Sequence, residues 1–262
     1  MFKTYSLYIF LFLSALSFLR ASLNKNIECS ICDRSIKDKE YLLDVWGNPF
    51  HLSHKNDGIF CECCSRIISK KITNGGYQLN DGRYICSLCD ISIIKTKEEV
   101  TNSFNNVKKI LNEIGVDLIH EEEIDIQLIN RTDMGNYYNF NENHHLQGLT
   151  KISLDNDKIF QIFILDNVPK IQFEATLAHE LMHVWLYKKN IQLSKPMMEA
   201  FCNLGSYLIY KSDNTKFSKI HILSMENKNT NPYVKEYKLL KSLMDKTNFK
   251  HILKNITTIN IQ

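Results

Sequence analysis

The sequence predicts an α+β protein built from two parts, a small cysteine-rich β-hairpin module and a larger domain of strands followed by helices. Paired cysteines and histidines are concentrated in residues 27–92. β-Branched runs bounded by Asn, Asp and Gly follow within residues 124–166, and helical patterns fill most of the chain after residue 176. With 262 residues, the chain is long enough for one or two domains and a substantial core.

Residues 1–21 have the pattern of a secretory signal peptide. An early lysine is followed by an apolar run interrupted by serines, which is short for a membrane span and lacks a strong basic flank. Cleavage is expected after Ser17 or Ala21. We therefore expect a secreted or periplasmic protein without a membrane span. The alternative is that the segment stays uncleaved and anchors the protein in a membrane.

Six of the eight cysteines form three Cys-x2-Cys pairs, and a His-x2-His pair lies between the first two of them. Structural zinc sites are closed tetrahedral sets of four nitrogen and sulfur ligands, which such pairs supply. Disulfides are the alternative in an exported chain. The order of the pairs predicts two structural zinc sites, the first formed by Cys29, Cys32, His51 and His54 and the second by Cys61, Cys64, Cys86 and Cys89.

Cys63 is adjacent to the second pair and is an alternative ligand in place of Cys64. Between the second and third pairs, Asn74-Gly75-Gly76 and Asp81-Gly82 are turn signals that flank short strands. The module is expected to cover residues 27–92, and a core of this size needs metal in order to fold.

The larger domain is expected to span residues 95–260 and to open with an amphipathic helix within residues 96–118. Thr96 and Glu99 resemble a capping box, and Gly115 suits the C-terminal end of the helix. Strand-like runs follow at residues 124–130, 149–154 and 158–166.

The stretch Leu177–Lys189 contains the pattern HExxH, in which His179 and His183 are four residues apart. On an α-helix these side chains lie one turn apart on the same face, where they can share one metal ion. Glu180 is adjacent and can take a proton from water as a general base. The last strand, or its neighbour, is expected to offer the edge along which an extended substrate pairs. The alternative is a solvated helix that carries two imidazoles.

A second helix is predicted after a polar loop, with Ser194 as its cap and Pro196 in its first turn. If this helix runs antiparallel to the first, Glu199 reaches the two histidines as the third ligand of a catalytic zinc. Asn203 is one turn further on and is a candidate partner for a ligand imidazole. For Glu199 the alternative is an exposed carboxylate, and Cys202 is expected to be a small core residue.

Two later residues are candidates for stabilising an oxyanion, a role that peptide hydrolysis requires. They are His221, among apolar neighbours, and Tyr233, at the start of a late helix. The alternative for both is a packing role.

These motifs resemble a known family. The two adjacent four-ligand sites, the second closing with Cys86-Ser-Leu-Cys89, resemble a LIM domain. The segments AHELMHVWL and MMEAFCNLGSYL are similar to the peptidase domain of the DA-one family, LIM-containing zinc peptidases known from plant organ-size control. The resemblance covers about residues 27–260.

The resemblance implies a zincin-like metallopeptidase with one catalytic and two structural zinc ions. His179, His183 and Glu199 would be the catalytic ligands and Glu180 the base. Two features depart from the plant proteins: His54 stands where their LIM domains usually have cysteine, and six residues separate it from Cys61. An export signal, instead of an upstream ubiquitin-interacting helix, is typical of a secreted or periplasmic bacterial relative.

The sequence therefore favours a zinc-dependent peptidase that hydrolyses peptide bonds of a protein or peptide substrate, with a LIM-like module that binds the substrate or a protein partner. The alternative is a non-catalytic, zinc-binding adaptor. Metal content separates the two, with three zinc ions per chain expected for the peptidase and two for the adaptor. Nucleic acid is not expected as a partner, because the net charge is only +3 and both signs are interspersed.

Overall fold

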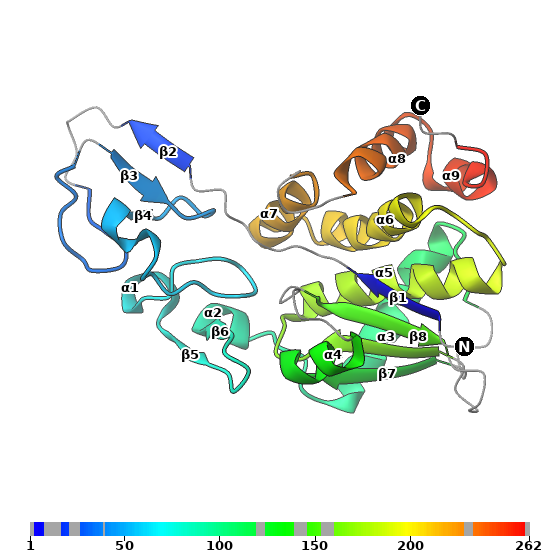
Figure 1. Cartoon of the computed structure of the whole chain (residues 1–262), viewed down its shortest axis with the longest axis horizontal. Coiled ribbons are helices and arrows are strands. Elements are labelled where there is room, and N and C mark those ends of the chain that lie inside the picture. Colours follow the sequence, from blue (N-terminus) through cyan, green and yellow to red (C-terminus); the bar gives the residue numbers. More distant parts are fainter. Residues whose placement is uncertain are drawn as a thin grey trace. The chain divides into compact units, whose positions relative to one another are not determined.

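The computed structural model describes residues 3–7, 17–20, 27–38, 40–118, 124–138, 146–152, 160–227 and 233–259. The chain is a mixture of helices and small sheets and divides into two compact units (Figure 1). The larger unit comprises Ile94–Asp166 and Lys170–Gln262 together with Met1–Phe10. The smaller unit comprises Leu11–Ile93 together with Asn167–Pro169.

A four-stranded sheet forms one layer of the larger unit, with the order β1-β8-β9-β7. β7 pairs with β9 in parallel, whereas β8 is antiparallel to both β9 and β1. β9 is buried at every position except Gln161, which suits its apolar sequence FQIFIL and its place inside the sheet. The strands are β1 (Lys3–Leu7), β7 (Ile124–Ile129), β8 (Gly148–Ile152) and β9 (Phe160–Leu165).

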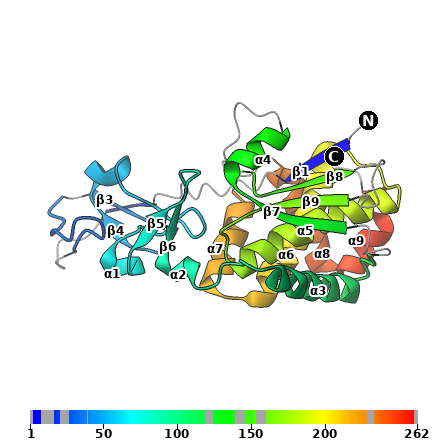
Figure 2. The same ribbon diagram turned by 90° about the horizontal axis from the view of Figure 1, so that it is seen from below.

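Helices cover both faces of this sheet (Figure 2). On one face, Tyr137 of α4 (Arg131–Tyr138) stacks on Phe163 of β9, with ring centroids 4.5 Å apart. On the opposite face lies α5 (Lys170–Lys188), which Thr150 of β8 reaches with its side chain. α5 is buried along most of its length because it lies between the sheet and further helices.

α5 packs closely against α6 (Lys195–Asp213). Gly205 permits this approach, because a Cβ at that position would lie 3.0 Å from Met182 Cγ and 3.1 Å from the Ala178 carbonyl oxygen. Ser206 Oγ donates a hydrogen bond to the Ala175 carbonyl oxygen at 2.7 Å. The remaining helices of this layer are α3 (Lys97–Glu113), α7 (Lys216–Met225), α8 (Val234–Lys246) and α9 (Phe249–Asn255).

The predicted first helix of the larger domain is confirmed as α3. Thr96 Oγ1 accepts a hydrogen bond from Glu99 N at 3.2 Å, and Glu99 Oε2 accepts one from Thr96 N at 2.9 Å, which completes the capping box. Gly115 follows the helix with φ of +95°, a left-handed conformation that glycine adopts without strain.

The smaller unit consists of short elements around buried apolar side chains such as Leu42, Phe50 and Ile67. The predicted hairpin is formed by β5 and β6, and the Asp81-Gly82 turn lies between these strands. The elements are β2 (Ser17–Arg20), β3 (Glu40–Leu43), β4 (Pro49–Phe50), the 3-10 helix η1 (Leu52–Lys55), α1 (Lys70–Thr73), β5 (Gly76–Gln78), β6 (Tyr84–Cys86) and α2 (Ser87–Asp90).

A buried carboxylate connects the two halves of the smaller unit. Asp44 Oδ1 accepts hydrogen bonds from Trp46 N and Asn48 N, both at 2.9 Å. Asp44 Oδ2 accepts from Ile67 N at 3.1 Å. Trp46 Nε1 in turn donates to the Cys64 carbonyl oxygen at 2.7 Å.

Parts of the predicted signal peptide form strands in two of the three sheets found among the described residues. Residues 3–7 form β1 against β8, and residues 17–20 form β2 against β3. The other residues of segment 1–21 lie outside the described ranges. Among the described residues, no helix is both long and apolar enough to span a membrane.

Candidate metal centres

The two histidines of the HExxH pattern converge on α5. His179 and His183 are both buried, and their Nε2 atoms lie 3.0 Å apart. Glu199 enters from α6, with Oε2 at 3.4 Å from His179 Nε2 and Oε1 at 3.9 Å from His183 Nε2. Glu199 itself is only 1% exposed, so it is not the solvated carboxylate of the alternative interpretation.

Burial sets the protonation of this cluster. It lowers the pKa of both His179 and His183 to about 3, so the imidazoles are neutral at physiological pH and each keeps a lone pair. Burial raises the pKa of Glu199 to about 7. Neutral imidazole and carboxylate are the forms that bind a metal ion.

Asn203 fixes the orientation of one imidazole. Its Oδ1 lies 3.1 Å from His179 Nδ1, and a hydrogen bond there places the imidazole proton on Nδ1. His179 Nε2 is then left as the acceptor atom that faces His183 and Glu199. This is the arrangement typical of a metal-binding histidine and its supporting partner.

The cluster suits a metal ion by its spacing and by its unpaired atoms. Ligand atoms around a tetrahedral zinc with bonds of about 2.0 Å lie roughly 3.3 Å from one another. Among the described residues, Glu180 Oε1 and both carboxylate oxygens of Glu199 have no hydrogen-bond partner, although all three atoms are buried. Buried carboxylates normally need hydrogen bonds or a cation.

Glu180 lies fully buried next to the first histidine, and its carboxylate points to β8. Thr150 Oγ1 donates a hydrogen bond to Glu180 Oε2 at 2.7 Å. Burial raises the pKa of Glu180 well above its usual range, and the hydrogen bond from Thr150 offsets only part of that shift. The sequence interpretation of Glu180 did not include Thr150. The signal in the sequence would have been a threonine at the centre of a short strand, where its hydroxyl is buried and needs an acceptor.

Cys202 lies in the same cluster. Its Sγ and the imidazole nitrogens of His179 and His183 all lie within 4.8 Å of one another. Burial raises the pKa of this thiol, which keeps it protonated. Cys202 is fully buried, as expected of a core residue, but its position close to both imidazoles was not anticipated. The signal in the sequence is its spacing of three residues from Glu199, which puts both side chains on one face of α6.

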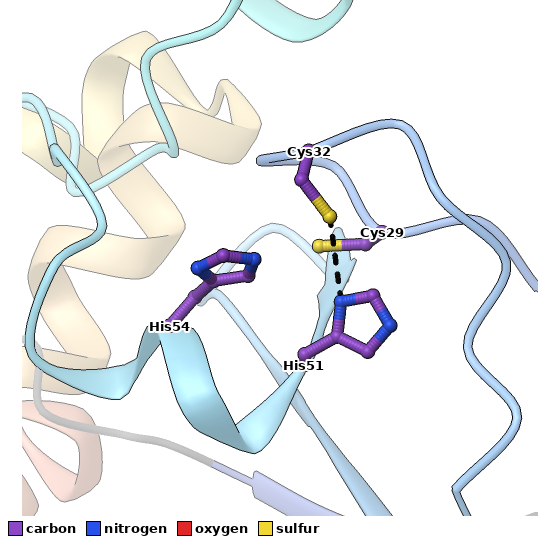
Figure 3. A group of neighbouring side chains, drawn as sticks. All are labelled: Cys29, Cys32, His51 and His54. Carbon is purple, nitrogen blue, oxygen red and sulfur yellow. Dashed lines mark hydrogen bonds between the residues drawn. The ribbon is translucent and has the colours of Figure 1, made fainter.

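The first cluster of the smaller unit brings together Cys29, Cys32, His51 and His54, whose ligand atoms all lie within 4.8 Å of one another (Figure 3). Cys32 Sγ lies 3.5 Å from His51 Nδ1, and the other nitrogen of His51 lies 3.4 Å from the Ser35 carbonyl oxygen. His54 Nδ1 lies 3.1 Å from the Asp57 carboxylate. Each imidazole thus has one nitrogen held by an oxygen atom, as ligand histidines usually do.

The second cluster contains Cys61, Cys64, Cys86 and Cys89, all buried, with their sulfur atoms within 4.8 Å of one another. Cys64 Sγ lies 3.7 Å from Cys86 Sγ. Cys63 contacts Cys61 and Cys89 of this cluster, and its thiol also donates to the Asn167 carbonyl oxygen at 3.6 Å. All eight cysteines lie within the described residues, and none of them forms a disulfide.

The backbones of the two knuckles repeat each other. Cys29 N donates to the Arg34 carbonyl oxygen and Cys61 N donates to that of Arg66, both at 2.8 Å. In each knuckle the fifth residue, Asp33 or Ser65, has positive φ and donates back to the cysteine carbonyl oxygen. The two half-modules therefore present their cysteines through one local geometry.

The oxyanion candidates lie in different surroundings. His221 of α7 is buried and contacts the rings of Tyr210 and Phe217, and its Nδ1 lies 3.2 Å from Tyr210 Oη. Tyr233 is half-buried at the N-cap of α8. The aromatic stack accounts for the burial of His221, and the oxyanion role of either residue stays a prediction.

Within the described residues, the chain is a mixed helix-and-sheet protein with three groups of cysteine or histidine side chains that could hold metal ions, the third of them formed by His179, His183 and Cys202. No family model matches the chain, and neither does any curated protein or solved structure. The DA-one-like resemblance therefore stays a prediction based on the motifs alone.

Proposed function

We propose that the protein is a zinc-dependent peptidase that hydrolyses peptide bonds of protein substrates, with a zincin-like domain of the DA-one type and a LIM-like module. One observation carries the proposal: HExxH and Glu199 meet as a buried set of neutral imidazoles and a carboxylate, with a second carboxylate, Glu180, beside them. A non-catalytic adaptor has no need of that second, costly buried carboxylate.

His179, His183 and Glu199 would hold the catalytic metal. A zinc ion bound there would supply the Lewis acidity that polarises a substrate carbonyl and acidifies water. Glu180 then accepts a proton from the attacking water and passes it to the leaving amine. Asn203 keeps the imidazole of His179 in the tautomer that binds metal.

The substrate would bind along β8. The strand expected as the edge, β9, lies between β8 and β7, so its neighbour β8 is the strand next to Glu180. β1 pairs with the other side of β8 in antiparallel fashion, from Lys3↔Ile152 to Leu7↔Gly148. The pairing supports the idea that this edge accepts an extended chain. Once residues 1–21 are removed, a substrate backbone would take the same place.

The two clusters of the smaller unit would each hold a structural zinc ion. Each offers four nitrogen or sulfur ligands, which leaves no position open for a substrate. We assign the LIM-like module to binding of the substrate or a protein partner.

We further propose that residues 1–21 direct export and are cleaved. Mass spectrometry of the protein recovered outside the cytoplasm should then find Phe18 or Ser22 as the N-terminal residue. An intact N-terminus on protein from the cytosol would oppose the export proposal and leave the metal sites unaffected.

The Glu180→Gln variant tests the peptidase function directly. Gln keeps the size and polarity of the side chain but cannot act as a base, so cleavage of an unstructured protein such as casein should fall by roughly two to four orders of magnitude. Zinc content should stay at three ions per chain. Equal cleavage by both proteins would refute the peptidase assignment, and a wild-type content of two zinc ions would favour the adaptor.

A further inference from the structure

Resting on the peptidase function proposed above, we propose that Gly148 and Thr150 of β8 are positioning residues that together form a cradle for the carboxylate of Glu180. Gly148 and Thr150 face the same side of β8, because residues two positions apart on a strand point the same way. This face of β8 lies against α5, the helix that carries Glu180.

Thr150 is the donor of the cradle. Its hydroxyl is fully buried and lies 2.7 Å from Glu180 Oε2 and 3.4 Å from the Glu180 backbone carbonyl oxygen. A hydroxyl has one proton, and the shorter contact to a carboxylate is the stronger bond. The proton stays on Thr150 during the reaction, so its role is to hold Oε2 in place. Oε1, which has no hydrogen-bond partner among the described residues, remains as the oxygen that receives a proton from water.

Gly148 provides the space in the cradle. A Cβ at this position would lie 2.5 Å from Glu180 Oε1 and 2.6 Å from Thr176 Cγ2. The added Cβ would clash with Oε1, the oxygen assigned to proton transfer. Any larger residue at position 148 must therefore displace the Glu180 carboxylate or move β8. The φ angle of Gly148 is not in the left-handed region, so the need for glycine here comes from this contact and not from the backbone.

The kinetics of two variants test whether the Thr150 hydroxyl positions Glu180. Thr150→Val removes the hydroxyl at nearly constant volume and should lower kcat by roughly 10- to 100-fold, the worth of a hydrogen bond to a charged group, with KM little changed. Thr150→Ser keeps the hydroxyl and should recover most of that loss. Both should retain the wild-type zinc content. A Thr150→Val enzyme with wild-type kcat would overturn the proposal, as would an equal loss in Thr150→Ser.

Gly148→Ala tests whether glycine at this position makes room for the Glu180 carboxylate. Gly135→Ala is the matched control. A Cβ at Gly135, on α4, has no heavy atom within 4 Å, so this control should keep wild-type activity and stability. Gly148→Ala should lose at least as much kcat as Thr150→Val while still binding three zinc ions. If Gly148→Ala behaves like Gly135→Ala, Gly148 does not shape the site.

A denaturation cycle separates this proposal from the peptidase function itself. Thr150→Val should lower the folding equilibrium constant by roughly tenfold in the wild-type background. In a Glu180→Ala background the effect should be much smaller, because the acceptor of the Thr150 hydrogen bond is already missing. Additive effects would overturn the cradle whether or not the protein cleaves anything. If the wild type cleaves nothing but the two residues are coupled, the peptidase function fails while the contact between Thr150 and Glu180 stands.

Discussion

Asn203 Oδ1 lies 3.1 Å from His179 Nδ1, so a side chain of α6 sets the orientation of an imidazole on α5. Glu199, one turn earlier on α6, lies next to the other nitrogen of the same imidazole, Nε2. The ring of His179 is therefore held from both sides by one helix, and the geometry of the cluster depends on how α5 and α6 pack.

Replacing Asn203 should weaken metal binding without removing a ligand. Asn203→Ala leaves His179 free to rotate or change tautomer, and we expect the affinity of the catalytic site to fall by about 10- to 100-fold. Asn203→Asp keeps an oxygen at the same place and should stay close to the wild type. Competition with a chelator of known affinity measures both. Unchanged affinity in Asn203→Ala would mean that packing alone orients the imidazole.

If Glu199 binds the proposed catalytic zinc, replacing Glu199 should remove that ion. Glu199→Ala deletes a ligand and leaves two imidazoles, so zinc content should fall from three ions to two per chain, with cleavage lost in parallel. Cys202→Ala is the matched control, because its thiol lies in the same cluster on the same helix. We expect that control to keep three ions. If Cys202→Ala binds two ions and Glu199→Ala keeps three, Cys202 is the third ligand.

Gly205 should be sensitive to size because it lies where the two helices cross. Gly205→Leu forces side-chain atoms against Met182 and the Ala178 carbonyl, and we expect a loss of about 1–3 kcal/mol in the free energy of unfolding. Urea denaturation measures this loss. Gly135→Leu, on an open surface of α4, should change the stability far less.

The second cysteine cluster should depend on Cys86 and not on Cys63. Cys86→Ser removes one of four sulfur ligands and should release that zinc ion and unfold the smaller unit. Cys63→Ser replaces a buried thiol that contacts the Asn167 carbonyl, so the metal content should be unchanged. Atomic absorption of the two purified variants decides the matter, and metal loss in Cys63→Ser would restore Cys63 as a ligand.

The sequence predicted those features that depend on local spacing. The capping box at Thr96, the hairpin turn at Asp81-Gly82 and the pairing of His179 with His183 all follow from residues a few positions apart. Glu199 lies 3.4 Å from His179 Nε2, because an antiparallel helix pair with a short loop has few other arrangements, and its role as a metal ligand stays a prediction.

Contacts between distant elements were not predictable in the same way. Thr150 is thirty residues from Glu180, and only the register of β8 over α5 brings the two together. Cys202 was assigned to the core because an apolar helix face cannot be told apart from the lining of a metal cluster in a single sequence. The choice of β8 over β9 as the strand beside Glu180 likewise depended on strand order, which the sequence does not specify.

Asp44 has a consequence for how the smaller unit would take up the two metal ions proposed for it. Its carboxylate bonds the turn after β3 to Ile67, the residue that follows the second knuckle, and Trp46 from that turn bonds to Cys64. Distortion of either cluster therefore breaks hydrogen bonds that order the other. Assembly of the two clusters should be cooperative: a chelator should withdraw both ions in a single all-or-none transition, and Asp44→Ala should split that transition into two.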